Sequence, residues 1–208
     1  MMTTTWGYTL TEADVLPDIL SVEEYDTFTS DKYASDYSRS RANIYAAQAA
    51  VRNYCGWHVA PSLACRIATN FYDKRLSKNA GYLLIQLPAT FVADVTSVTI
   101  GGKEYDTYVF DTNGTLRVHG VDWTGVRPYT LVTVEYIAGI SLDMAAGIRE
   151  LIAHRVTHAM ASTSGVQSES VGGVSVTYNA NWTNSARATA LADDNKEVLS
   201  PYRLRGVF

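Results

Sequence analysis

The sequence predicts an α+β protein in which a helical bundle carries an inserted antiparallel β-sheet region. Two long segments with helical periodicity flank a segment in which β-branched and aromatic residues alternate with polar ones. The composition is that of a folded protein, since 47% of the 208 residues are hydrophobic and 18% are charged. The sequence has no internal repeat and no clear linker, so we expect a single domain.

We divide this domain into five parts along the chain. They are a helical N-terminal part (1–59), a β insert (60–139), a central helix (140–163), a hairpin loop (164–180), and a C-terminal helix with an extended tail (181–208). The first residues have neither a basic nor an apolar region, so we expect no signal peptide. No stretch approaches the roughly 20 apolar residues of a membrane-spanning helix. Cys55 and Cys65 are therefore expected to be reduced intracellular thiols.

Short helical pieces are expected between residues 8 and 33. Ser21 followed by Glu24 is typical of a helix N-terminus, and the segment from Thr11 to Asp14 also resembles a first helical turn. A longer helix is expected from Ser35 or Asp36 to Cys55, with Gly56 as its cap. Its predicted apolar face consists of Tyr37, Ile44, Ala47, Val51, Tyr54 and Cys55.

This long helix has a second side that suits a contact between subunits. A stripe of small residues lies opposite a basic flank formed by Arg41, Gln48 and Arg52. Small side chains let another helix approach closely, so we expect packing on both sides. Arg155, in the second long helix, falls within an apolar stripe and suits an ion pair across such a contact. The candidate interface residues are Arg41, Ala42, Ala46, Ala49, Arg52 and Arg155.

The segment from Pro61 to about Gly139 predicts one half-buried antiparallel sheet. Gly101-Gly102 and Asn113-Gly114 supply the positive φ that two-residue hairpin turns require. The strand from Thr130 to Tyr136 alternates, with Val132, Val134 and Tyr136 on one face.

A second long helix is expected from Ser141 to about Ser162. Its apolar face consists of Met144, Ile148, Leu151, Ile152, Val156 and Ala159. The residues after Gly165 alternate around Gly172-Gly173 and predict a projecting β-hairpin loop. A short helix is expected over 188–199, and Pro201 closes it and leaves residues 202–208 as a tail.

Glu150, His154 and His158 form the strongest candidate for a chemical site, because they share one helix face at i, i+4 and i+8. Such spacing can hold zinc, and a metal-dependent hydrolase is therefore an alternative function. Arg155, however, occupies the position where a zinc protease has its general base, and it would repel a cation. The sequence contains no nucleophile motif, phosphate-binding loop or dinucleotide fingerprint. We predict no catalytic residue, metal or cofactor.

The tail is too short to bury its own apolar side chains, so it either frays or docks onto another protein. We favour docking. The tail residues concerned are Leu199, Tyr202, Arg203, Leu204, Arg205, Val207 and Phe208. The first 31 residues contain seven acidic and no basic side chains, which suggests contact with a basic partner or a solvated surface. The net charge of −4 does not favour a dedicated nucleic-acid-binding protein.

Three stretches resemble the head-tail connector (adaptor) proteins of long-tailed bacteriophages. They are residues 52–61 (RNYCGWHVAP), 165–178 (GVQSESVGGVSVTY) and 199–203 (LSPYR). The resemblance implies a structural virion protein of the neck, present in the host cytoplasm before assembly. Such a protein forms a ring, a dodecamer, under the portal protein, joins capsid to tail and contacts a downstream head-closure or tail protein.

The resemblance also assigns roles to segments. The ring would line the channel through which double-stranded DNA passes without sequence-specific binding, and no membrane is involved. The tail would dock onto the portal, and Ser168, Glu169, Gly172 and Gly173 would face the channel or the next ring. A carbohydrate-binding virion module that uses aromatic residues of the β insert, such as Trp123, is a further alternative.

Overall fold

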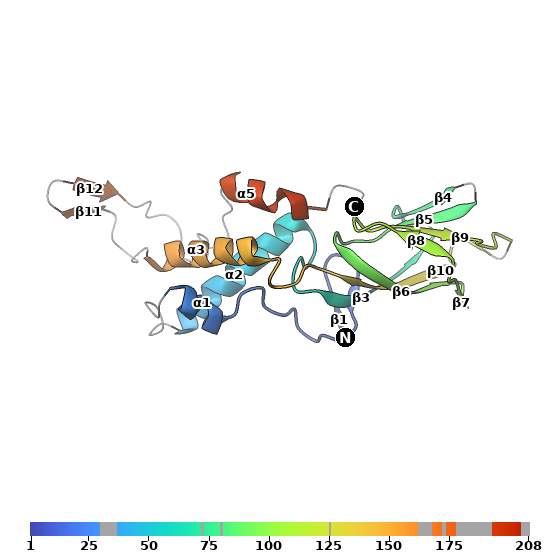
Figure 1. Cartoon of the computed structure of the whole chain (residues 1–208), viewed down its shortest axis with the longest axis horizontal. Coiled ribbons are helices and arrows are strands. Elements are labelled where there is room, and N and C mark those ends of the chain that lie inside the picture. Colours follow the sequence, from blue (N-terminus) through green and yellow to red (C-terminus); the bar gives the residue numbers. More distant parts are fainter. Residues whose placement is uncertain are drawn as a thin grey trace. The chain divides into compact units, whose positions relative to one another are not determined.

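The computed structural model describes residues 1–29, 37–71, 73–79, 81–124, 126–161, 168–171, 174–177 and 193–204. Its helices are α1 (Val22–Phe28), α2 (Tyr37–Cys55), α3 (Ala146–Ala161), α5 (Asp193–Leu199) and the short 3-10 helix η2 (Ser200–Tyr202). Its strands are β1 (Met2–Thr3), β2 (Thr9–Leu10), β3 (Leu63–Asn70), β4 (Leu76–Asn79), β5 (Tyr82–Gln86), β6 (Val92–Ile100), β7 (Lys103–Glu104), β8 (Tyr108–Phe110), β9 (Thr115–His119), β10 (Leu131–Ala138), β11 (Ser168–Val171) and β12 (Val174–Thr177). The mixed α+β class is confirmed (Figure 1).

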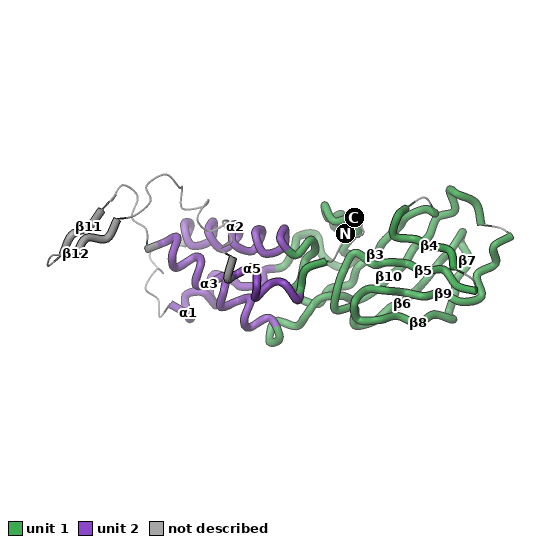
Figure 2. Tube along the Cα trace, turned by 90° about the horizontal axis from the view of Figure 1, so that it is seen from above, with its two compact units in different colours: residues 1–17, 55–144, 202–208 green, residues 18–54, 145–201 purple. Residues whose placement is uncertain are grey.

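The chain divides into two compact units, coloured in Figure 2. Unit 1 consists of Met1–Pro17, Cys55–Met144 and Tyr202–Phe208, and unit 2 of Asp18–Tyr54 and Ala145–Pro201. The first 17 residues thus belong to the β-rich unit. They contain strands β1 and β2, and the helical turn expected at Thr11–Asp14 is wrong. Leu10 explains the difference, because it is fully buried and pairs with Cys65 of β3.

Unit 1 contains two antiparallel sheets, which corrects the expectation of one. The strand orders are β1-β2-β3-β10-β6-β7 and β4-β5-β9-β8. The four-stranded sheet lies above the other in Figure 1 and overlaps it in Figure 2, so the sheets form two layers. The chain leaves the first sheet after Glu104, where β7 ends, and β8 joins the second sheet. Each sheet thereby buries one alternating face.

A buried histidine connects three segments of unit 1. The His58 Nε2–H donates to the carbonyl oxygen of Ala138, at 2.9 Å, which fixes the tautomer because a carbonyl can only accept. The Nδ1 atom then accepts from the hydroxyl of Tyr8, at 2.7 Å. That hydroxyl in turn accepts the backbone N–H of His58. The N-terminal segment, the start of the β region and the end of β10 are therefore held at one point.

Unit 2 contains the helices. Helix α1 has the expected N-cap at Ser21, and the structure adds a capping box in which Ser21 and Glu24 satisfy each other's backbone N–H groups. Helix α3 begins at Ala146 rather than Ser141, because residues 142–145 form turns and Ser141 Oγ accepts the N–H of Met144. Met144 is consequently 66% exposed, and its placement on the apolar face is wrong. The other residues predicted for that face are all buried: Ile148, Leu151, Ile152, Val156 and Ala159.

Strands β11 and β12 pair with each other, with Ser168 opposite Thr177 and Val171 opposite Val174. Gly165, Gly172 and Gly173 lie outside the described residues, as do the expected helix start at Ser35 or Asp36 and residues 188–192. Among the described helices, none combines the length and the apolarity that crossing a membrane requires.

Candidate functional site

The most detailed contact among the candidate residues is made by the start of the tail, at a surface that we call the C-terminal seat (Cys55, Gly56, Trp57 and Phe91). The indole Nε1–H of Trp57 donates to the carbonyl oxygen of Tyr202, at 2.6 Å. The N–H of Leu204 donates to the carbonyl oxygen of Cys55, at 2.9 Å. The seat therefore binds the backbone of the tail at two points.

Ring and methyl contacts add to these hydrogen bonds. The aromatic rings of Phe91 and Tyr202 lie 5.5 Å apart between centroids. A Cβ atom at Gly56 would come within 3.7 Å of the Leu204 side chain. Gly56 ends α2 in the left-handed region, at φ 80°, and this turn brings Trp57 beneath the tail. Phe91 also has a positive φ of 58°, a strained conformation for a residue with a side chain.

The tail residues fall into three groups. Leu199 is fully buried in unit 2. Tyr202 and Leu204 are half-buried, whereas Arg203 between them is exposed. Arg205, Val207 and Phe208 lie outside the described residues. Sequence reasoning missed Trp57 and Phe91: the polar N–H of a buried tryptophan needs an acceptor, which is a usable signal, but nothing in the sequence marks the backbone of Phe91.

The side of α2 that carries the small residues is open. Arg41, Ala42 and Ala49 are exposed and Ala46 is half-buried. Tyr45, which sequence reasoning missed, is 45% exposed and stacks with Arg41, whose guanidinium carbon lies 5.4 Å from the ring centroid. The Arg41 Nε–H also donates to the Tyr45 hydroxyl, at 3.2 Å. The i, i+4 spacing of Arg41 and Tyr45 in the sequence would have allowed this pair to be predicted.

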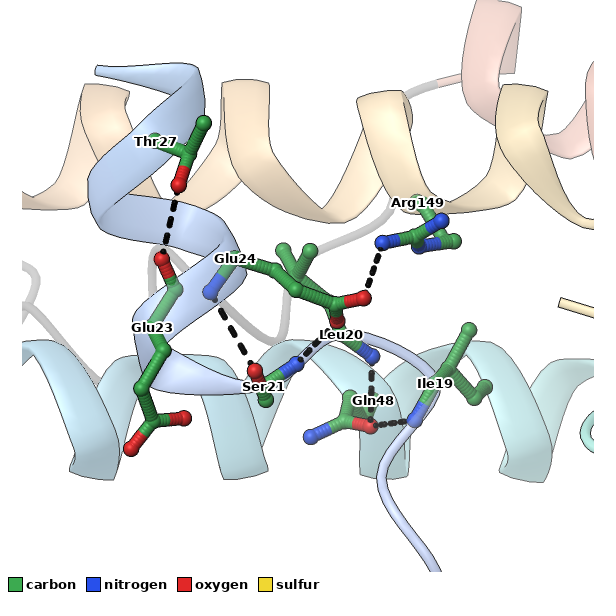
Figure 3. Close-up of polar contacts among 8 residues, drawn as sticks. All are labelled: Ile19, Leu20, Ser21, Glu23, Glu24, Thr27, Gln48 and Arg149. Carbon is green, nitrogen blue, oxygen red and sulfur yellow. Dashed lines mark hydrogen bonds and ion pairs between the residues drawn. The ribbon is translucent and has the colours of Figure 1, made fainter. Parts of the chain in front are cut away.

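Of the predicted basic flank of α2, only Arg41 is exposed, whereas Gln48 and Arg52 are buried. The expected surface position of Gln48 is therefore wrong. Its side chain is 1% exposed, and its Oε1 accepts the N–H groups of Ile19 and Leu20. Figure 3 shows these bonds together with the ion pair from Arg149 of α3 to Glu24 of α1, at 2.5 Å. The chain leading into α1 covers this part of α2, and one of the N-terminal acidic residues is neutralised within unit 2.

Arg52 and Arg155, the other two interface candidates, are each 7% exposed. Burial lowers the pKa of the Arg155 guanidinium from its ordinary value. Both side chains therefore lie within the subunit, beneath its surface.

Glu150, His154 and His158 are all exposed on α3. Within the residues that the structure describes, no three His, Cys, Asp or Glu side chains form a group that could hold a metal ion. Burial raises the pKa of both the Cys55 and the Cys65 thiol to about 12, so neither is a nucleophile at neutral pH.

Trp123 is partly covered by its neighbours in unit 1. The ring of Phe71 meets it edge-on at 6.0 Å, and the Lys78 ammonium lies 4.5 Å from the centroid of a Trp123 ring. Such packing gives no specific support to a sugar-binding platform. Of the hairpin candidates, Ser168 and Glu169 lie in β11.

Comparisons with known proteins give one family match and one structural match. A family model described as "Head completion protein" (HCP) matches residues 18–203. A solved structure described as the neck of a native GTA particle, computed with C12 symmetry, has a similar fold, with a TM-score of 0.50. The alignment covers 96% of this chain and 97% of that chain at 15% sequence identity. No curated protein matches the chain.

Proposed function

The chain belongs to the head completion protein family, and we propose that it acts as a head-tail connector that forms a ring under the portal. The family match over residues 18–203 carries this proposal and confirms the resemblance found in the sequence. It makes the protein a structural component of the phage virion, at the neck. By analogy with the neck solved with C12 symmetry, we propose a ring of twelve copies.

The ring would join capsid to tail and line the channel for double-stranded DNA. The net charge of −4 per chain supports passage rather than binding, because tight binding of phosphates requires many Lys and Arg contacts. The loop of Ser168, Glu169, Gly172 and Gly173 would face this channel or the next ring. A head-closure or tail protein would bind below.

The open side of α2 is the surface that we propose for contact between neighbouring copies. Arg41 and Tyr45 offer an aromatic and cationic pair of the kind that is enriched at interfaces, and Ala42 and Ala49 leave room beside it. The buried Arg52 and Arg155 would support this contact from within the subunit. The helices of unit 2 would form the bundle that the ring requires.

We propose no catalytic role, in keeping with a family of structural proteins. Neither the exposed Glu150, His154 and His158 nor the packed Trp123 offers an observation that favours a hydrolase or a carbohydrate-binding module.

Removal of Arg205 to Phe208 tests the portal-docking role of the tail. The truncated chain keeps every described residue, so we expect it to fold with an unchanged unfolding midpoint. Its binding to the purified portal, measured by co-sedimentation, should be lost. Portal binding as tight as that of the full chain would refute the docking role.

A further inference from the structure

We propose that the C-terminal seat is a binding site for the chain's own segment Tyr202–Leu204, and that it fixes the point from which the docking residues leave the subunit. The proposal rests on the docking role proposed above. It goes further by dividing the tail into an anchor, Tyr202–Leu204, and a docking peptide that begins at Arg205.

Two hydrogen bonds hold the anchor on either side of Arg203. In one, the carbonyl oxygen of Tyr202 accepts the indole N–H of Trp57. In the other, the N–H of Leu204 donates to the carbonyl oxygen of Cys55. Because the partners are Cys55, the last residue of α2, and Trp57, two residues later, both bonds relate the anchor to the same short stretch of chain. The backbone between them has little freedom left.

The contacts of Trp57 favour occupancy of the seat. Trp57 is fully buried when the anchor is in place, so departure of the anchor would remove the acceptor of its indole N–H and uncover the seat that the anchor now covers. Phe91 holds a positive φ of 58° while its ring meets Tyr202. Strained residues persist where surrounding contacts over-determine them, and they are concentrated at binding sites.

The anchor also decides which side chains remain for a partner. Tyr202 and Leu204 are half-buried against their own subunit, whereas Arg203 is exposed. The docking peptide follows Leu204 directly, so its point of attachment is the anchor. An anchor that is held before the portal binds loses less conformational entropy on binding than a free one.

The seat itself can be tested without the portal. We expect the Leu204 amide of the full chain to exchange with deuterium at least about tenfold more slowly than in a free peptide of residues 196–208, because it is bonded to Cys55. Exchange at the rate of the free peptide would overturn the proposal.

A matched pair of variants tests the positioning role. Leu204→Pro removes the N–H donor, whereas Leu204→Ala keeps it and removes most of the side chain. We expect portal affinity to fall roughly tenfold or more for Leu204→Pro and less than about threefold for Leu204→Ala, with equal unfolding midpoints. Equal portal affinity of the two variants would overturn the positioning role.

Trp57→Phe is a second test variant, because it removes the indole N–H that donates to Tyr202 and keeps an aromatic ring. It should release the Leu204 amide to faster exchange and weaken portal binding as Leu204→Pro does. Protection of that amide in the variant at the level of the full chain would contradict the seat. Failure of the docking role has a different signature: the chain without Arg205 to Phe208 would bind the portal normally while Leu204 stayed protected.

Discussion

His58 is the residue whose surroundings best explain why the first 17 residues belong to unit 1. Its two ring nitrogens and its backbone N–H bond to Tyr8 and Ala138, so it connects β10 with the segment around Tyr8, which lies 50 residues before His58. The chain passes this site through Gly139, at φ 115°, where a Cβ would lie 2.5 Å from the oxygen of Pro61 and 2.9 Å from His58 Nε2.

Gly139→Ala should therefore destabilise the protein. The added methyl would collide with backbone and with the buried imidazole, and we expect a loss of about 2 to 4 kcal/mol in the free energy of unfolding. Urea unfolding followed by tryptophan fluorescence measures it. Gly147→Ala is the matched control, because no atom lies within 4 Å of that Cβ and alanine favours the helix by about 0.5 to 1 kcal/mol. Equal effects of the two changes would contradict the assignment.

Asp73 gives a pH-dependent prediction. The Arg75 guanidinium beside it, together with hydrogen bonds from Thr69 and the Arg75 N–H, holds the pKa of this carboxyl well below its ordinary value. A lowered folded-state pKa stabilises the protein above the unfolded-state pKa of about 4, and the stabilisation is lost as pH falls toward the folded-state pKa.

Asp73→Asn should accordingly destabilise the protein at pH 7, and the difference from the wild type should shrink progressively below about pH 4. Urea titrations at several pH values test this, with Asp143→Asn at an exposed position as the control. A difference that stays constant down to pH 3 would rule out the linkage.

Among the elements, α1 shows how a seven-residue helix is kept in place. Its capping box satisfies two N–H groups, Glu24 also pairs with Arg149, and Gln48 binds the backbone just before the helix (Figure 3). Isolated helices of this length are unstable in water, so these polar contacts and the buried side chains of Val22 and Tyr25 hold it in place.

Ser21→Ala should lower the free energy of unfolding by about 1 kcal/mol, because the N–H of Glu24 loses its acceptor. Thr27→Ala on the same helix removes an exposed hydroxyl bonded to the carbonyl of Glu23, and its effect should stay within about 0.5 kcal/mol. Chemical denaturation of both variants provides the comparison. An effect of Ser21→Ala no larger than that of Thr27→Ala would mean that the capping box contributes nothing.

Local signals predicted several elements well, and most failures concern elements whose position is decided by distant segments. The capping residues of α1, the end of α2 at Cys55 and the turn at Gly101-Gly102 all depend on neighbouring residues. The second sheet and the strands β1 and β2 depend on pairing with remote strands, which periodicity cannot reveal. Gln48 was misplaced for the same reason, because the segment that buries it lies about 30 residues earlier.

At the scale of the whole molecule, the sequence predicted the family, whereas the contacts of the tail are known only from the structure. The three motif stretches predicted the family, and the match over residues 18–203 confirms it. Residue patterns alone predicted a docking tail but could not show that Tyr202 and Leu204 contact Trp57 and Cys55, since those contacts span about 145 residues. The sequence therefore signals at most that Trp57 needs an acceptor, and the rest of the C-terminal seat could not be predicted from it.

Ala49→Glu should block assembly without unfolding the subunit. Ala49 is exposed in the single chain, but a carboxylate there would be buried without a partner between copies. Electron microscopy of the variant mixed with portal should show no closed ring, whereas Ala68→Glu, at an exposed position of β3, should assemble normally. Normal rings of Ala49→Glu would exclude the open side of α2 as the contact.

Cryo-electron microscopy of the full chain bound to its purified portal tests the ring most directly. We predict a closed ring of twelve copies, with the Tyr202–Leu204 segment of each copy on its own seat and the following residues against the portal. A chain that remains monomeric with portal present at any concentration, or density that leaves the portal surface bare, would contradict it.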